Sequence, residues 1–187
     1  MWKIHIDYTA DLAQQFLLED LRKVILRTRF LYVQTKPPQN LGHGYFEPIT
    51  LCLCWCDFLG ALYCGDGKMG NTERSKTYIT EVLGMQNARY KSAAKHLVKT
   101  YRNGPVHAYA PEGNFNIVLN NKDEHLAEKQ KPFCLVVSVD TLLSDLEQSV
   151  VWYAENIRKT GGSSGHGTLA ALNQARRDLL NYVEEET

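Results

Sequence analysis

The sequence predicts a mainly α-helical bundle with a small two-stranded β insertion. Apolar residues recur with a helical period through most of the 187 residues, whereas only two short runs have the apolar, β-branched character of strands. The chain is 44% hydrophobic and 22% charged, which is an ordinary composition for a soluble globular protein. This length is most simply a single domain, over residues 1–187, with a hydrophobic core of useful size.

The first two helices are separated by a proline- and glycine-containing loop. We expect the first helix over residues 11–33, because its apolar residues follow the helical period. The segment 36–44 contains two prolines and two glycines and is predicted to be a loop. Pro48 suits the first turn of a second helix that runs to about Cys64. This helix is apolar on nearly all sides, as expected of a helix surrounded by others.

Two more helices are predicted before the β insertion. The third is expected to begin at Asn71 as its N-cap and to stop at Gly84. The fourth is expected over residues 88–103. Its buried stripe should consist of Tyr90, Ala94, Leu97 and Tyr101.

The second half of the chain contains the strands and two further helices. Strands are expected at residues 115–119 and 133–139, joined by the exposed charged loop 121–131 of a hairpin-like arm. Asp140 or Ser138 should cap a long helix whose apolar stripe consists of Leu142, Leu146, Val150, Tyr153 and Ile157. The glycine- and serine-rich segment 161–167 is a predicted flexible connector. A terminal helix follows it, with the apolar residues Leu169, Leu172, Leu179 and Val183.

Charge and cysteine content restrict the class of protein. Lys+Arg and Asp+Glu both number 21, and this balance argues against a protein that coats nucleic acid non-specifically. It still allows an enzyme that grips one or two phosphates locally. We expect no secretory signal and no membrane span, since Asp57 breaks the longest apolar run. The five cysteines are an odd number, which favours a reducing cytoplasm.

Several candidate sites have simpler structural explanations. Cys52 and Cys56 would share a helix face, but no second pair of ligands completes a zinc site, so we expect buried core cysteines. The glycine-rich segment 65–70 lacks the order of a phosphate-binding loop. We expect no metal and no cofactor. The remaining histidines are expected to be solvated polar residues: His43, His96, His125 and His166.

The segment Tyr101-Arg102-Asn103-Gly104-Pro105-Val106-His107 is the strongest functional candidate. Arginine binds phosphate, and histidine exchanges a proton near neutral pH. Pro105 should bend the chain so that His107 returns beside Arg102, with both side chains reaching solvent in a cleft. In that arrangement His107 would act as base or acid, Arg102 would stabilise a crowded phosphorane, and Asn103 would orient the phosphate or the histidine.

Arginine, asparagine and then histidine after four intervening residues resembles the R-x4-6-H motif of HEPN domains. Members of that family are compact helical bundles, commonly dimeric, and many are metal-independent ribonucleases. The resemblance implies a HEPN-like bundle with catalytic Arg102, Asn103 and His107. It also implies a homodimer with a composite site, an RNA substrate cut through its 2′-hydroxyl, and a toxin with a cognate inhibitor protein. Gly104-Pro105 departs from the uninterrupted helix that is usual around the motif.

A second interpretation belongs to another functional class. The chain would be a non-catalytic helical module that binds a protein or a nucleotide, and Arg102 and His107 would only cap local structure. Geometry discriminates between the two. Accessible, adjacent Arg102 and His107 side chains favour the enzyme. An Arg102 paired with a buried carboxylate, and a His107 that faces away from it, favour the module.

Overall fold

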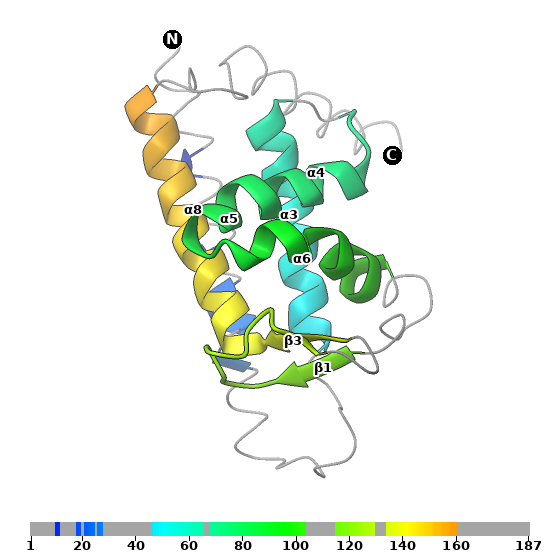
Figure 1. The fold of residues 1–187 in the computed structure, drawn as a ribbon. Helices are drawn as coiled ribbons and strands as arrows, with labels where there is room; N and C mark the ends of the chain where they lie inside the picture. The colour runs from blue at the N-terminus through cyan, green and yellow to red at the C-terminus, as the bar shows by residue number, and fades with distance from the viewer. Residues whose placement is uncertain are drawn as a thin grey trace, which may run out of the picture.

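The computed structural model describes residues 10–11, 18–19, 21–24, 26–27, 46–65, 68–103, 115–129 and 134–160. Within these ranges the protein is mainly helical and carries a small mixed sheet, as the sequence predicts (Figure 1). The expected connector at 161–167 and the terminal helix lie outside the described residues.

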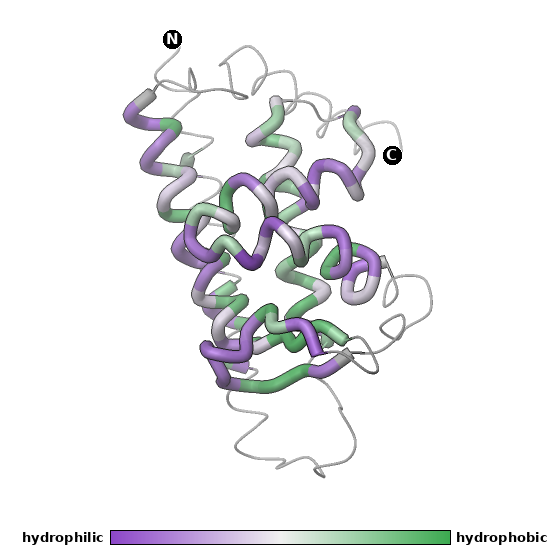
Figure 2. Tube along the Cα trace, in the orientation of Figure 1, coloured by the Kyte–Doolittle hydropathy of each residue, from purple (hydrophilic) through white to green (hydrophobic). Residues whose placement is uncertain are grey.

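Helix α3 (Phe46–Cys64) is the central element of the bundle. Pro48 lies in its first turn, where a missing N–H costs no hydrogen bond, and Gly65 follows its end with a φ of 67°. It packs against α4 (Asn71–Tyr78), η3 (Val98–Asn103) and α8 (Val139–Thr160). Figure 2 shows that the hydrophobic residues of α3 continue into the sheet, while the outer helices alternate between hydrophobic and hydrophilic residues.

By length and composition, helix α3 could also cross a membrane. We did not expect this from the sequence, because Asp57 interrupts its apolar run. Helix α3 is the one helix of this kind among the described residues. Half of its 18-residue apolar window is buried inside the protein, as in the core helix of a globular domain. This burial is consistent with a soluble protein.

The third predicted helix is longer than expected. Helix α4 begins at Asn71, but Gly70 is its N-cap and no side chain caps it. The chain continues as a π-helix, η2 (Ile79–Leu83), and then as α5 (Gly84–Gln86). Gly84 is therefore not the stop, because its backbone is still right-handed helical. The helix ends at Asn87, whose backbone is extended.

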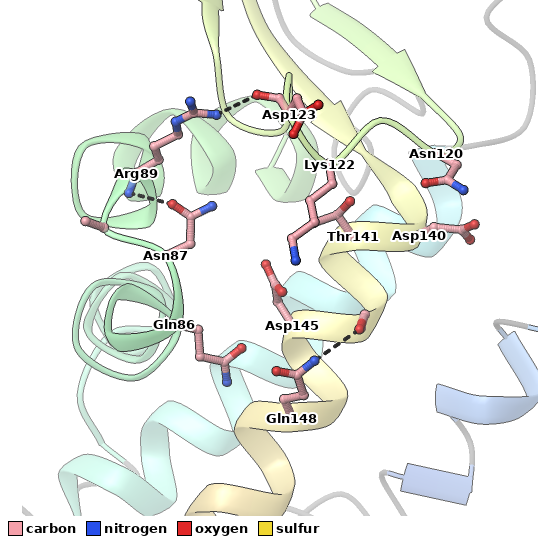
Figure 3. A pocket seen from close by; sticks show the side chains of 12 residues that line it. Gln86, Asn87, Arg89, Asn120, Lys122, Asp123, Asp140, Thr141, Asp145 and Gln148 are labelled. Carbon is pink, nitrogen blue, oxygen red and sulfur yellow. Dashed lines mark hydrogen bonds between the residues drawn. The ribbon is translucent and has the colours of Figure 1, made fainter.

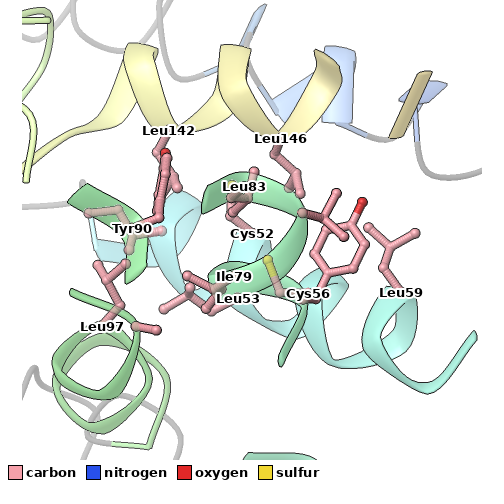
Figure 4. Packing of buried hydrophobic residues seen from close by; sticks show 14 of the residues in the cluster. Cys52, Leu53, Cys56, Leu59, Ile79, Leu83, Tyr90, Leu97, Leu142 and Leu146 are labelled. Carbon is pink, nitrogen blue, oxygen red and sulfur yellow. The ribbon is translucent and has the colours of Figure 1, made fainter. Parts of the chain in front are cut away.

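Helix α6 (Arg89–Leu97) and the π-helix η3 together form the predicted fourth helix. The expected stripe is confirmed, since Tyr90, Ala94, Leu97 and Tyr101 are all buried. Figure 4 shows Tyr90 beside Leu142 of α8, while Leu97 lies farther from α8 in the same core cluster, which also includes Leu53 of α3. One hydrophobic core therefore joins α3, α6 and α8.

The sheet has three strands rather than two. Strand β1 (Phe115–Val118) pairs in parallel with β3 (Cys134–Ser138), so these two strands do not form the predicted hairpin. The third strand, β2 (Glu128–Lys129), pairs antiparallel with β3 inside the segment that was predicted to be a loop. The β3 strand is central and buried, which explains its apolar run.

Helix α8 starts directly after β3. Ser138, one of the two expected caps, precedes its first residue, and its hydroxyl lies 2.9 Å from that of Thr141. The described residues of the first helix lie along α8 in the opposite direction. Arg22 Nε donates to Glu147 Oε1 at 3.1 Å, and Arg158 Nη2 donates to Asp11 Oδ1 at 2.7 Å.

Candidate functional site

Arg102 lies in the last turn of η3, which continues α6 with a wider winding. π-Helical turns inside longer helices are frequent at functional sites. Thr50 of α3 fixes this turn, because its hydroxyl lies 2.8 Å from the carbonyl oxygen of Tyr101 and 2.9 Å from that of Phe46. The backbone immediately before Arg102 is thereby attached to α3.

The Arg102 side chain is bonded to a carboxylate of α3. Its Nη2 donates to Asp57 Oδ2 at 2.8 Å, while Arg74 Nε of α4 donates to Asp57 Oδ1 at 2.7 Å. One aspartate therefore joins two arginines and three helical segments. The Arg102 side chain is only 12% exposed and that of Asp57 is 16% exposed, so solvent screens this ion pair weakly.

This geometry corrects one expectation and leaves another as a prediction. Arg102 does not reach freely into solvent, because Asp57 and the surrounding helices cover most of it. Its pairing with a mostly buried carboxylate is one of the two conditions set for the non-catalytic module. The second condition concerns His107, which lies outside the described residues. Asn103 is the last residue of η3, and its side chain is also outside them.

Two cysteines of α3, Cys52 and Cys56, are part of the core, as the sequence predicts. Cys52 and Cys56 are fully buried, and none of the five cysteines, all of which are described, forms a disulfide. Burial raises the pKa of both thiols, and neighbouring cysteines raise it further. Cys54 lies closer to Arg102. Burial raises its pKa more than the arginine lowers it, so this thiol is not poised as a nucleophile.

A polar cleft of about 780 Å³ forms a second candidate site, at the junction of α5 with α6, the turn after β1 and the first turns of α8 (Figure 3). Amide and hydroxyl side chains line much of it, among them Asn87, Asn120 and Gln148. Lys122 and Asp145 both point into the cleft, and their charged ends lie near each other. None of the described residues that line it is aromatic, which is unfavourable for stacking a base or a sugar ring.

Behind this cleft a buried chain of hydrogen bonds holds Asp145. The backbone N–H of Ser138 donates to His125 Nδ1 at 3.1 Å, so the neutral imidazole carries its proton on Nε2. That nitrogen lies 2.9 Å from Tyr90 Oη, which donates in turn to Asp145 Oδ2 at 2.9 Å. Burial raises the pKa of Asp145, against smaller lowering effects of Tyr90 and Lys122. The carboxylate is thus fixed toward the cleft.

The prediction for the environment of His125, a residue type common in functional sites, was wrong. This histidine was expected to be solvated in the charged loop, but it is 0% exposed. The turn that carries it folds inward, with Leu126 at a φ of 59° and hydrogen-bonded through its N–H to the carbonyl oxygen of Val136 at 2.8 Å. Burial and then the charge of Arg89 lower the pKa of His125 to about 4.

The described residues contain no group of three or more His, Cys, Asp or Glu side chains placed to hold a metal ion. Comparison of the whole chain with family models, with curated proteins and with solved structures finds no match.

Proposed function

We propose that the protein is a metal-independent endoribonuclease of the HEPN type, in which Arg102 stabilises the charge that develops on the phosphate. The observation that carries this proposal is the order Arg102-Asn103 followed by His107, which is similar to the R-x4-6-H motif. The 2.8 Å bond between Arg102 Nη2 and Asp57 Oδ2 would orient the guanidinium. A guanidinium held by a carboxylate has its orientation fixed before substrate arrives, and fixed donors stabilise a transition state better than mobile ones. Arg74 holds the other oxygen of Asp57, so these three side chains carry one excess positive charge.

The remaining roles follow from the order of residues after Arg102. His107 would remove the proton of the RNA 2′-hydroxyl or protonate the leaving oxygen, and Asn103 would orient the phosphate or the imidazole. The hydroxyl oxygen then attacks the adjacent phosphorus while the bond to the 5′-oxygen breaks. The products are a 2′,3′-cyclic phosphate and a 5′-hydroxyl end. Two copies of the chain would supply the motif across a twofold axis.

The second candidate function is a non-catalytic helical module that binds a protein or a nucleotide. The 12% exposure of the Arg102 side chain favours it, since a guanidinium so covered has little surface left for substrate. In this alternative the Asp57–Arg102 pair only joins α3 to η3. The two candidates predict different effects of replacing His107. The replacement should abolish most of the activity of an enzyme, but it should leave the binding of a non-catalytic module intact.

Cleavage of RNA by the purified protein in EDTA tests the proposal. We expect total RNA to be cut to fragments with 2′,3′-cyclic phosphate ends, and DNA to remain intact because it lacks the attacking hydroxyl. His107→Ala should lower the rate about a hundredfold or more, the usual size of an acid–base contribution. His96→Ala, on the helical segment that leads to Arg102, is the matched control and should retain the wild-type rate. Equal activity of wild type and His107→Ala would refute this function.

Several further features belong to the same proposal. The enzyme would be a homodimer, would act as a toxin on cellular RNA, and would be held inactive by a cognate inhibitor protein. We place it in the cytoplasm, because its five cysteines form no disulfide and two of them are fully buried thiols. Light scattering at micromolar concentration tests the dimer, and a monomer would contradict the composite site.

A further inference from the structure

The helix that leads to Arg102 carries a stripe of exposed lysines. Lys91, Lys95 and Lys99 are all exposed on α6 and η3. Residues four apart share one face of a helix and rise by about 6 Å along its axis. The stripe therefore forms a row of evenly spaced positive charges along the outside of the bundle. Figure 1 shows α6 lying outside the central helix α3.

The surroundings of this stripe in the sequence are unusually free of acid. The 30 residues 82–111 contain five Lys and Arg and no Asp or Glu. The rest of the chain has 16 basic residues against 21 acidic ones, although the whole protein is neutral. The helix thus concentrates positive charge that the overall balance conceals. Among charged neighbours from other elements, Glu128 of β2 acts on His96, the imidazole within the same helix.

Two lysines on other helices are arranged differently. Lys76 pairs with Glu73 at 2.7 Å, and Lys159 pairs with Glu155 at 3.6 Å, each on its own helix. Lys91 and Lys95 make no ion pair within the described part of the chain. Like charges four residues apart repel each other by a few tenths of a kcal/mol. A simple solvated face would be expected to carry acids between the lysines, as those helices do.

We propose that Lys91, Lys95 and Lys99 bind successive phosphates of a single-stranded RNA and guide it toward Arg102. This inference rests on the proposed ribonuclease function and names how its substrate is held. The rise between the lysines is close to the spacing of successive phosphates along a strand, so each ammonium meets one phosphate. The contacts read the backbone and not the bases, which makes binding sequence-tolerant and dependent on salt.

Fluorescence anisotropy with a labelled single-stranded RNA tests the stripe apart from catalysis. Binding is measured in EDTA on the full chain carrying His107→Ala, so that cleavage does not remove the probe. The triple variant Lys91→Gln, Lys95→Gln and Lys99→Gln is compared with a matched triple on other helices. That control, Lys23→Gln, Lys76→Gln and Lys159→Gln, removes the same net charge. Circular dichroism of both triples confirms that they are folded.

The expected result is a loss of affinity of about tenfold or more for the stripe variant at low salt. The slope of log affinity against log salt should fall by about 2, because each phosphate contact on a single strand contributes about 0.7. The control triple should keep its slope. An equal loss in the two triples, or wild-type affinity in the stripe variant, would overturn the proposal. So would displacement of the RNA by polyglutamate on an equal-charge basis, which would indicate an acidic protein as partner.

This outcome is separate from that of the ribonuclease test. If the stripe binds RNA as expected but the wild-type protein cuts no RNA in EDTA, the catalytic proposal fails while the binding surface stands. If the wild type cuts RNA and the stripe variant binds normally, the enzyme stands and the stripe is refuted.

Discussion

Asp57 and Arg102 are 45 positions apart in the chain and 2.8 Å apart in the fold, joined through Oδ2 and Nη2. The same carboxylate accepts from Arg74 through its other oxygen. An aspartate in the middle of an apolar helix is therefore the point at which α3, α4 and η3 are tied together by charge. This placement also explains why the apolar interior of α3 retains an acid, apart from Glu47 in its first turn.

Removing the carboxylate should be costly for stability. Asp57→Ala leaves Arg74 and Arg102 mostly covered without the acid that compensates them, and such losses cost about 3–5 kcal/mol. We expect this loss in the free energy of unfolding by urea denaturation. Glu155→Gln breaks the exposed pair with Lys159 and should change stability by less than about 0.5 kcal/mol. Arg102→Ala combined with Asp57→Ala should cost less than the two single changes together, since they share one interaction.

Gly60 allows the close approach of α3 and α4. A Cβ at this position would lie 2.2 Å from the carbonyl oxygen of Arg74, a backbone atom that cannot turn away. We expect Gly60→Ala to lower the free energy of unfolding by about 2 kcal/mol or more, as overpacking in a core does. Gly70→Ala is the control, because a Cβ there meets nothing within 4 Å. Similar melting temperatures for the two variants would contradict the tight crossing.

Tyr153 carries a buried hydroxyl that makes no hydrogen bond within the described part of the chain. Its ring packs with those of Tyr63 and Tyr78 at centroid distances of 6.4 Å. Tyr153→Phe keeps the ring and removes the unsatisfied group, so stability should be unchanged or rise by about 1 kcal/mol. Tyr78→Phe instead breaks a 3.1 Å bond to Ser149 and should lower stability by about 1 kcal/mol. Chemical denaturation of both variants measures the two changes in the free energy of unfolding.

His125 should make stability depend on pH in the mildly acidic range. Its pKa in the folded protein is about 4, below the ordinary value of 6.5, so the unfolded chain binds more protons between these values. The folded state is then favoured above pH 6.5 and loses stability as the pH falls toward 4. Between pH 7 and pH 5 the expected loss is about 2 kcal/mol. His125→Gln should be less stable at pH 7 but should lose less on acidification, and an unchanged pH profile would contradict the buried neutral imidazole.

The elements that the sequence predicted well are those whose signal is local. The buried stripe from Tyr90 to Tyr101 follows from spacing alone, and so does the start of α3 near Pro48. The end of the third helix was wrong because a glycine can remain helical when its neighbours pack well, as Gly84 does. Strand direction was also wrong. Whether two strands pair in parallel depends on the path between them, which apolar content does not reveal.

The chemistry of the sites depends even more on distant partners. Charged neighbours in the sequence predicted an exposed His125. It is buried because its ring nitrogens find partners inside the protein, namely Tyr90, 35 positions earlier, and the backbone of Ser138. Arg102 was singled out as a candidate from its motif, but nothing near it in the chain identifies Asp57 as its partner. An aspartate in the middle of an apolar helix was the available signal, because a buried charge requires a compensating one.

The reactivity of the two buried thiols of α3 reports how often the hydrophobic core opens. Cys52 and Cys56 are covered on all sides, and a raised pKa keeps them protonated. A thiol reagent therefore gains access to them only when α3 separates from its neighbours. At high reagent concentration the modification rate equals the rate at which the bundle comes apart, and at low concentration it reports the equilibrium for opening. The lifetime of the core can thus be timed without introducing any label.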